Sequence, residues 1–237
     1  MTPGRVVEHP VSRDPGLAAR AVQWLAAPDR EVAVPRLAAT VMLVRDGAVG
    51  PEVFVQRRVA SMAFAPSTVV FPGGGVDPSD HTLDAATSGL AELALAMGVG
   101  VEQAAPFAAA AVREVEEECG VLLTVAALRG RAHWVTPEFE PRRYDTWILA
   151  AGMPAGQQAT GTTTEADHSG WVRPRDLLAR HTAGEVRMLP PTLVSLEQLA
   201  DFPDAGSFLA DRPRVARVMP ELVLGANGIP LVRTVLP

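Results

Sequence analysis

The stretch from Arg113 to Val121 constrains this chain most, because it places four glutamates within five positions. Alanine-rich sequence precedes it and Gly120 closes it. We therefore expect a helix of roughly three turns that begins near Pro106 and ends at a left-handed glycine. Residues three and four apart lie on the same face of a helix. Three of the carboxylates would then share one face: Glu114, Glu117 and Glu118.

Local electrostatics disfavours this cluster. Like charges at these spacings each destabilise a helix by a few tenths of a kcal/mol, and the last turns of a helix disfavour anions. Arg113 is the one cation in the stretch. Either the face is simply solvated, or a ligand offsets the repulsion. A hard divalent cation such as Mg²⁺, which binds oxygen ligands, would do so.

The same residues resemble the Nudix box, G-x(5)-E-x(7)-R-E-U-x-E-E-x-G-U, in which U is a bulky aliphatic residue. The segment from Arg113 fills every specified position of its second half, and Phe71-Pro72-Gly73-Gly74 looks like the strand end and glycine loop that open it. The resemblance runs from about residue 37 to 178. It implies an α+β Nudix fold, with a mixed sheet between helices.

The spacing inside the box departs from the family pattern. Gly74 and Arg113 are 39 positions apart where the box has 14, which leaves 25 extra residues (39 − 14). Counted back from Arg113, the first consensus glutamate would fall at Ala105, so we expect it to be absent. An insertion inside the box resembles the coenzyme A-directed branch of the family, which includes the mammalian peroxisomal enzymes.

The resemblance implies a role for each box residue. The glutamates Glu114, Glu117 and Glu118 would bind Mg²⁺ or Mn²⁺ with the Gly74 carbonyl nearby, and Arg113 would orient Glu117. We assign the catalytic role to Glu117, Arg113 and Glu114. Carboxylates around divalent ions can neutralise charge that develops on a diphosphate and activate the attacking water.

Substrate contacts are expected beside the glycine loop. Gly73 and Gly74 permit close backbone approach. Arg57 and Arg58 end the preceding strand, and guanidinium groups suit diphosphate recognition, although a solvated strand end would look the same. The coenzyme A branch has an arginine at this place. Its second arginine would fall at residue 63 or 64, where this chain has alanine and phenylalanine.

Three further polar residues are weighed. Glu165 lies in a polar loop before a strand, where several family members place a further metal ligand or base; a solvated loop glutamate is the alternative. His133 and His168 are lone histidines for which we expect surface or hydrogen-bonded roles.

We expect three parts along the chain: 1–34 with one short helix, a Nudix domain over 35–180 with a helical insertion at about 76–103, and a C-terminal extension over 181–237. The insertion should pack beside the site or build a dimer contact. The first fifteen residues look irregular. Helices are expected over 16–27, 83–97, 106–119, 175–180 and 191–199. Strands are expected over 37–44, 53–57, 69–71, 128–134, 144–151, from 171, 215–224 and 229–235.

Composition restricts the function classes. The chain has 237 residues, a net charge of −6, a pI of about 5.4 and one cysteine. No basic run suggests a nucleic-acid polymer as partner, no internal disulfide is available, and no apolar run reaches membrane-spanning length. The N-terminus lacks a secretory pattern. We therefore expect a soluble cytoplasmic protein without membrane partners, and a homodimer is left open.

These observations predict a divalent-metal-dependent hydrolase that cleaves a diphosphate linkage in a nucleoside diphosphate derivative. Coenzyme A or acyl-coenzyme A is the first substrate choice; nucleotide sugars, dinucleotides and ADP-ribose remain open. The alternative is a catalytically silent Nudix fold that binds a nucleotide or a partner. The intact glutamates favour the enzyme.

Overall fold

The computed structural model describes residues 1–237 except 1–4, 14, 28, 30, 60–66 and 162–165. The chain forms two compact units. The larger unit comprises Ala38–Ala132 and Trp147–Val215, and the smaller comprises Met1–Leu37, His133–Thr146 and Ala216–Pro237.

A mixed sheet forms the centre of the larger unit. Its strands are β2 (Arg36–Gly47), β3 (Gly50–Arg58), β4 (Thr68–Val70), β5 (Gly73–Gly75), β6 (Arg129–Val135), β7 (Tyr144–Gly152), β8 (Ala166–Val172) and β9 (Arg187–Met188). The order along the sheet is β6-β7-β2-β3-β4-β9, with β5 paired to β2 and β8 paired to β3. The α+β class expected from the sequence is confirmed.

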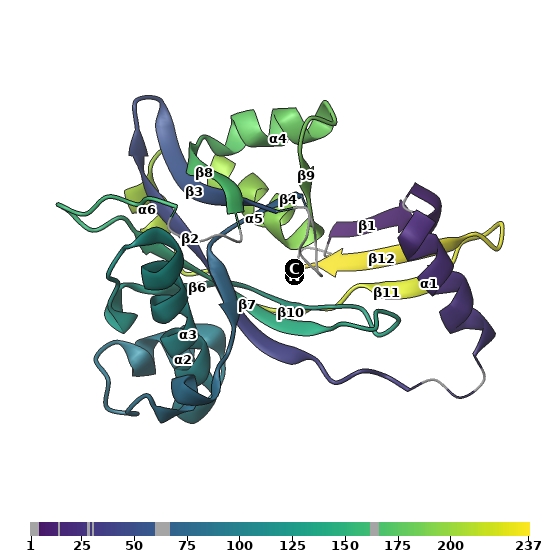
Figure 1. The fold of residues 1–237 in the computed structure, drawn as a ribbon, viewed down its shortest axis with the longest axis horizontal. Helices are drawn as coiled ribbons and strands as arrows, with labels where there is room; N and C mark the ends of the chain where they lie inside the picture. Colours follow the sequence, from purple (N-terminus) through teal and green to yellow (C-terminus); the bar gives the residue numbers. More distant parts are fainter. Residues whose placement is uncertain (1–4, 14, 28, 30, 60–66, 162–165) are drawn as a thin grey trace. The chain divides into compact units, whose positions relative to one another are not determined.

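Helices cover both faces of this sheet (Figure 1). The helices of the larger unit are α2 (Leu90–Met97), α3 (Val101–Cys119), α4 (Pro174–Thr182), α5 (Pro190–Ala200) and α6 (Ala205–Ala210). On β3, Phe54 joins the buried cluster that contains α2 and α3, whereas Val55 lines a hollow with Leu177 of α4. Because alternate residues of a strand face opposite sides, α3 and α4 lie on opposite faces of β3.

The hairpin β2–β3 follows directly from the sequence. The apolar residues 41–44 are fully buried, as expected for a central strand covered on both faces. Val44 pairs with Val53, and the register closes at Gly47 and Gly50 around a tight turn. Gly50 has a φ of 99°, in the left-handed region. The predicted hairpin is confirmed.

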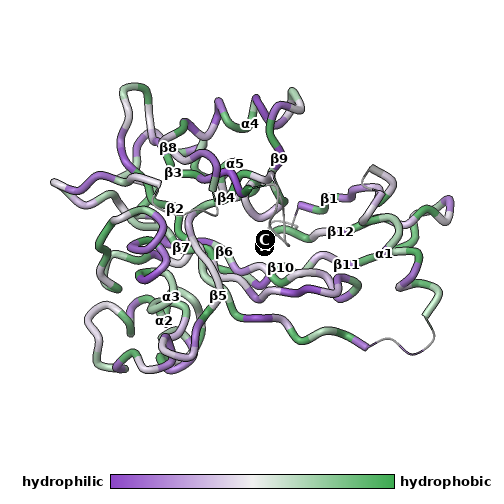
Figure 2. The backbone as a smooth tube through the Cα atoms, in the orientation of Figure 1, coloured by the Kyte–Doolittle hydropathy of each residue, from purple (hydrophilic) through white to green (hydrophobic). Residues whose placement is uncertain are grey.

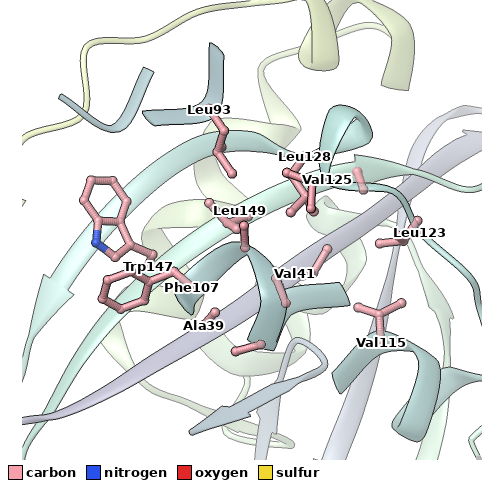
Figure 3. Packing of buried hydrophobic residues seen from close by; sticks show 14 of the residues in the cluster. Ala39, Val41, Leu93, Phe107, Val115, Leu123, Val125, Leu128, Trp147 and Leu149 are labelled. Atoms are coloured by element: carbon pink, nitrogen blue, oxygen red, sulfur yellow. The ribbon is translucent and has the colours of Figure 1, made fainter. Parts of the chain in front are cut away.

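The main core lies between the sheet and α2 and α3. Figure 3 shows Val41 and Leu149 from the sheet packed with Leu93 of α2 and Phe107 of α3. The Phe107 ring meets Trp147 edge-to-face, with centroids 6.3 Å apart. Burial of each large apolar side chain contributes about 1.5–3 kcal/mol.

Helix α3 begins earlier than the sequence predicts. It starts at Val101, not near Pro106, so the proline lies inside the helix. The expected start was wrong: a proline inside a helix costs about 3 kcal/mol or more, and burial of Pro106 and of its neighbours Ala105 and Phe107 offsets this cost. Hydrophobic in its middle and hydrophilic at its end (Figure 2), α3 stops at Gly120 with φ 67°, which confirms the predicted left-handed cap.

The helix in the insertion is shorter than expected, and several of its side chains are buried in the core. A 3-10 helix spans Pro78–Thr82, and α2 covers only Leu90–Met97. Gly89 precedes α2 with φ 83°, so residues 83–89 are not helical. Four α2 side chains are buried: Leu90, Leu93, Ala94 and Met97. The insertion is therefore part of the domain core and not a surface decoration.

The smaller unit contains a three-stranded antiparallel sheet, ordered β1 (Arg5–Pro10), β12 (Pro230–Leu236) and β11 (Glu221–Leu224). It also contains α1 (Pro15–Ala26), and β10 (Arg217–Val218), which pairs in parallel with the His133–Trp134 end of β6. The expectation of an irregular start was wrong: β1 pairs with β12, and Glu8 bonds Arg233 at 2.7 Å.

One other expectation was wrong, and one helix was not predicted. Trp171 lies near the end of β8 and not at the start of a strand, because the polar residues before it pair with β3 from Val53↔Val172 to Arg58↔Ala166. Helix α6 was not anticipated.

No single helix in the described ranges is long and apolar enough to cross a membrane. Helices α2 and α3 reach the required length and composition only together, and this pair is bent by 107°.

The buried face of α2 predicts that the insertion stabilises the domain. Leu93 is 2% exposed and Leu95, two residues on, is 83% exposed. We expect Leu93→Ala to lower the free energy of unfolding by about 2–5 kcal/mol, whereas Leu95→Ala should change it by less than about 0.5 kcal/mol. Urea unfolding followed by circular dichroism measures both. Equal effects of the two variants would mean that α2 is peripheral.

Candidate active site

The last turns of α3 present their glutamates to β5. Val115 and Cys119 point inward and are fully buried, which fixes the rotation of the helix. Glu114 is largely buried, with 13% of its side chain exposed, whereas Glu117 is 59% exposed. The pKa of the buried Cys119 thiol is raised to about 12, chiefly by burial, so this cysteine is an unreactive core residue.

The glycine loop approaches α3 so closely that side chains are excluded. β5 pairs with β2, with Thr40 opposite Gly73 and Ala39 opposite Gly74. A Cβ at Gly74 would collide with the carboxylate of Glu114. Gly73 has a φ of 148°, and a Cβ there would collide with the backbone of Ala39 and Thr40. Both glycines are therefore needed for the backbone to reach the glutamates.

A hydrogen bond ties the loop to the helix. The Gly73 N–H donates to Oε2 of Glu118 at 2.9 Å. Glu118 therefore holds the glycine backbone in place, and Glu114 lies directly against the next residue of the loop, Gly74.

Arg113 is the centre of the hydrogen-bond network. Its Nη1 donates to Glu114 Oε1 at 2.9 Å and to Glu117 Oε2 at 3.2 Å. Its Nη2 donates at 2.9 Å both to the Gly75 carbonyl and to Asp80 Oδ2, and Nε donates to Asp80 Oδ1 at 3.2 Å. One guanidinium thus connects two glutamates of α3, the end of the glycine loop and the start of the insertion.

Asp80 is a candidate-site residue that was not predicted from the sequence: it accepts two hydrogen bonds from Arg113. Counted back from Arg113, the position of the first consensus glutamate is Ala105, which is a buried core residue of α3, so no glutamate stands there. Counted forward from Gly74, with five residues between, that position is Asp80. The 25 extra residues therefore follow the acid (113 − 80 − 1 = 32, where the box has 7). Forward counting would have found it.

The electrostatics of the cluster follows from burial and from Arg113. Burial alone would raise the pKa of Asp80, which is 4% exposed, but hydrogen bonds from Arg113 and from the Asp77 N–H outweigh it and lower the pKa. The Asp80 carboxylate in turn raises the pKa of Arg113. Burial raises the pKa of Glu114, and Arg113 only partly counters this. The Asp80–Arg113 pair therefore stays ionised.

The donor chemistry of this cluster suits a hard divalent ion. Three carboxylates and the Gly74 carbonyl are oxygen ligands of the kind that Mg²⁺ prefers, and the bare Cα of Gly74 brings the loop against Glu114. Within the described ranges, no three His, Cys, Asp or Glu side chains converge closely enough to hold one ion. Instead, Arg113 donates hydrogen bonds to Glu114 and Glu117, and the Gly73 N–H donates to Glu118.

Arg57 and Arg58 face opposite sides of β3. Gln56 points to α3, where its Nε2 contacts Cys119 Sγ at 3.9 Å. The register with β8 shifts between Arg57 and Arg58, but the extra residue is in β8, so alternation along β3 puts Arg58 on the α3 side. Its Nε is buried and has no hydrogen-bond partner among the described residues. Arg57 is on the α4 side, bound to Asp167 at 2.7 and 3.0 Å. Of these two arginines, Arg58 is the one on the side of the glutamates.

The other singled-out residues lie elsewhere. Glu165 is outside the described residues, as are positions 63 and 64. His133, in the smaller unit, contacts Asp145 with Nε2 to Oδ1 at 2.6 Å, which agrees with the expected hydrogen-bonded role. His168 lines a hollow on the α4 side of β3.

Comparisons with known proteins agree with this geometry. The sequence pattern of the NUDIX domain matches residues 97–191. The crystal structure of a NUDIX hydrolase from Alicyclobacillus acidocaldarius is similar over 78% of this chain and 99% of that one, with 26% identity and a TM-score of 0.66. A nudix hydrolase of Caenorhabditis elegans is 25% identical over 187 residues, 64% of this chain. The match spans 57% of that relative's length. The chain is therefore similar to Nudix hydrolases, in sequence over residues 97–191 and in fold.

Proposed function

We propose that this chain is a divalent-metal-dependent hydrolase that cleaves a diphosphate linkage in a nucleoside diphosphate derivative. The observation that carries the proposal is the Arg113 network, which holds two α3 glutamates and the glycine loop together. Such an arrangement places several carboxylates beside a backbone that has no side chains to block an approaching phosphate.

Hydrolysis of a diphosphate requires that negative charge be neutralised while water attacks phosphorus. A bound divalent ion supplies Lewis-acid chemistry and lowers the pKa of water. Glu114, Glu117, Glu118 and the Gly74 carbonyl are the residues that would hold it. Glu117 is the exposed member, so it can turn toward a ligand without loss of packing. Arg113 is a positioning residue, because its donors are directed at protein acceptors.

Arg58 supports an anionic substrate on the same side of the sheet. A buried polar atom without a hydrogen-bond partner costs about 1–3 kcal/mol, and the Arg58 Nε is in that state among the described residues. A phosphate oxygen would satisfy it with a charge-assisted bond. Arg58 is thus our choice for the substrate-phosphate contact, with Gly73 and Gly74 as backbone contacts.

Within this class we propose coenzyme A or acyl-coenzyme A as the first substrates to test. The support is the insertion within the box and an arginine at position 58. The second arginine of the coenzyme A branch is missing, so nucleotide sugars, dinucleotides and ADP-ribose should be tested as substrates too.

A silent Nudix fold that only binds a nucleotide is the second candidate. The observation in its favour is that all three carboxylates have protein partners and do not converge on a metal position among the described residues. Product analysis with the full panel of diphosphate compounds, in Mg²⁺ and in Mn²⁺, separates the two. The enzyme gives two phosphorylated products from at least one compound. Binding of a panel member without turnover in either metal would establish the silent fold.

Glu117 should be essential for turnover and dispensable for folding. We expect Glu117→Gln to lower kcat by about 10²-fold or more, because one charged oxygen ligand becomes neutral. The matched control is Glu116→Gln, an exposed neighbour on the same helix, which should keep the wild-type kcat. Steady-state kinetics with circular dichroism measures both. Equal kcat values for the two variants would remove Glu117 from the mechanism.

Asp80 should act through Arg113. We expect Asp80→Asn to lower kcat roughly tenfold and stability by about 1–3 kcal/mol, because a buried charged hydrogen-bond pair is lost, while KM changes little. Asp77→Asn is the control, since Asp77 is 62% exposed and 3.8 Å from Arg113. Its kcat and midpoint of unfolding should match wild type. If Asp80→Asn lowered stability without any change in kcat, Asp80 would be purely structural.

Arg58 should contribute binding and not chemistry. We expect Arg58→Lys to raise KM roughly tenfold with a smaller change in kcat, because the charge remains but the planar fork is lost. Arg57→Lys, on the opposite face of the same strand, should leave KM unchanged. An unchanged KM for Arg58→Lys would show that the substrate does not reach this side chain.

A further inference from the structure

A hollow lies on the face of β3 that is turned away from the glutamate helix. It is enclosed by β3, β4, β8 and α4, which lie together in Figure 1, and has a volume of about 80 Å³. Arg57 and His168, which the hydrolytic site does not use, both line it. Because α3 is on the opposite side of the sheet, the hollow is separate from the glutamates.

The inner part of the hollow is apolar. Val55, Val69, Leu177 and Val186 line it, and each is 9% exposed or less. A cavity needs roughly 10–15 Å³ of this kind of volume to hold one water molecule, so a hollow of about 80 Å³ has room for a short aliphatic chain. An aliphatic tail of that length would fit where water would find no polar partner.

The outer part of the hollow is lined by hydrogen-bonding groups. The guanidinium groups of Arg57 and Arg180 and the imidazole of His168 line it. Asp167 binds Arg57 through Nε and Nη2 at 2.7 and 3.0 Å, and Glu185 is 3.4 Å from the Arg180 Nε. These carboxylates hold the two guanidiniums in place and offset their charge. A guanidinium has five N–H donors in a fixed fork, and Arg57 uses two of them on Asp167.

We propose that this hollow is a binding site for a short-chain aliphatic carboxylate. The tail occupies the apolar part between Val69 and Leu177, and the carboxylate accepts hydrogen bonds from Arg57 and Arg180. The site is independent of diphosphate hydrolysis, and its test does not use that activity.

Calorimetric titration of the full chain with butyrate tests the proposal, with butyramide as the neutral molecule of the same shape. Butyrate should bind at millimolar concentration and at least about fivefold more tightly than butyramide, because charge-assisted hydrogen bonds are the stronger ones. Equal binding of the two, or no binding of butyrate, would overturn the proposal.

Variants of the rim locate the site. Arg57→Gln and Arg180→Gln should each weaken butyrate binding about tenfold, which corresponds to one charge-assisted contact. Arg173→Gln is the matched control: Arg173 flanks the start of the same helix and pairs with Asp176 at 3.7 Å, but does not line the hollow. If all three variants bound butyrate like wild type, the ligand would sit elsewhere and the proposed site would be wrong.

Discussion

The Arg113 guanidinium is the interaction on which the rest of this structure depends. Three separate segments each contribute a hydrogen-bond acceptor to this one side chain: the glycine loop, the insertion and the glutamate end of α3. Without it, Glu114 and Glu117 would repel each other three residues apart on one helix. The pair with buried Asp80 fixes the guanidinium, and the guanidinium in turn fixes the carboxylates. The site is thus organised by a cation that need not touch the substrate.

The same pair explains how the box accommodates its insertion. The extra residues lie between Asp80 and Arg113, and the hydrogen bonds between these two side chains hold the ends of the inserted segment together. A longer closed loop costs only modest additional entropy. The α2 side chains offset this cost, since they fill the core beside Phe107 and Val125. The fold therefore tolerates 25 extra residues inside the box because their helix, α2, packs into the core.

Features that depend on residues close together in the chain could be predicted from the sequence, and features that depend on distant residues could not. Gly120 as a helix cap and the β2–β3 hairpin depend on neighbouring residues, so pattern alone located them. Asp80 was not predicted, because the extra residues separate it from Arg113, although its spacing from Gly74 is that of the box. β1 could not be predicted, because its hydrogen bonds come from β12 at the other end of the chain. Arg57 and Arg58 look equivalent until Gln56 shows which face of β3 meets α3.

The most direct test of the central claim is the position of a bound metal. Anomalous diffraction from crystals grown with Mn²⁺ would locate it without reference to activity. The account predicts one or more peaks within coordination distance of the Glu114, Glu117 and Glu118 carboxylates and the Gly74 carbonyl, with Glu117 turned away from Arg113. Mn²⁺ bound at full occupancy elsewhere, with Arg113 still holding Glu114 and Glu117, would contradict it.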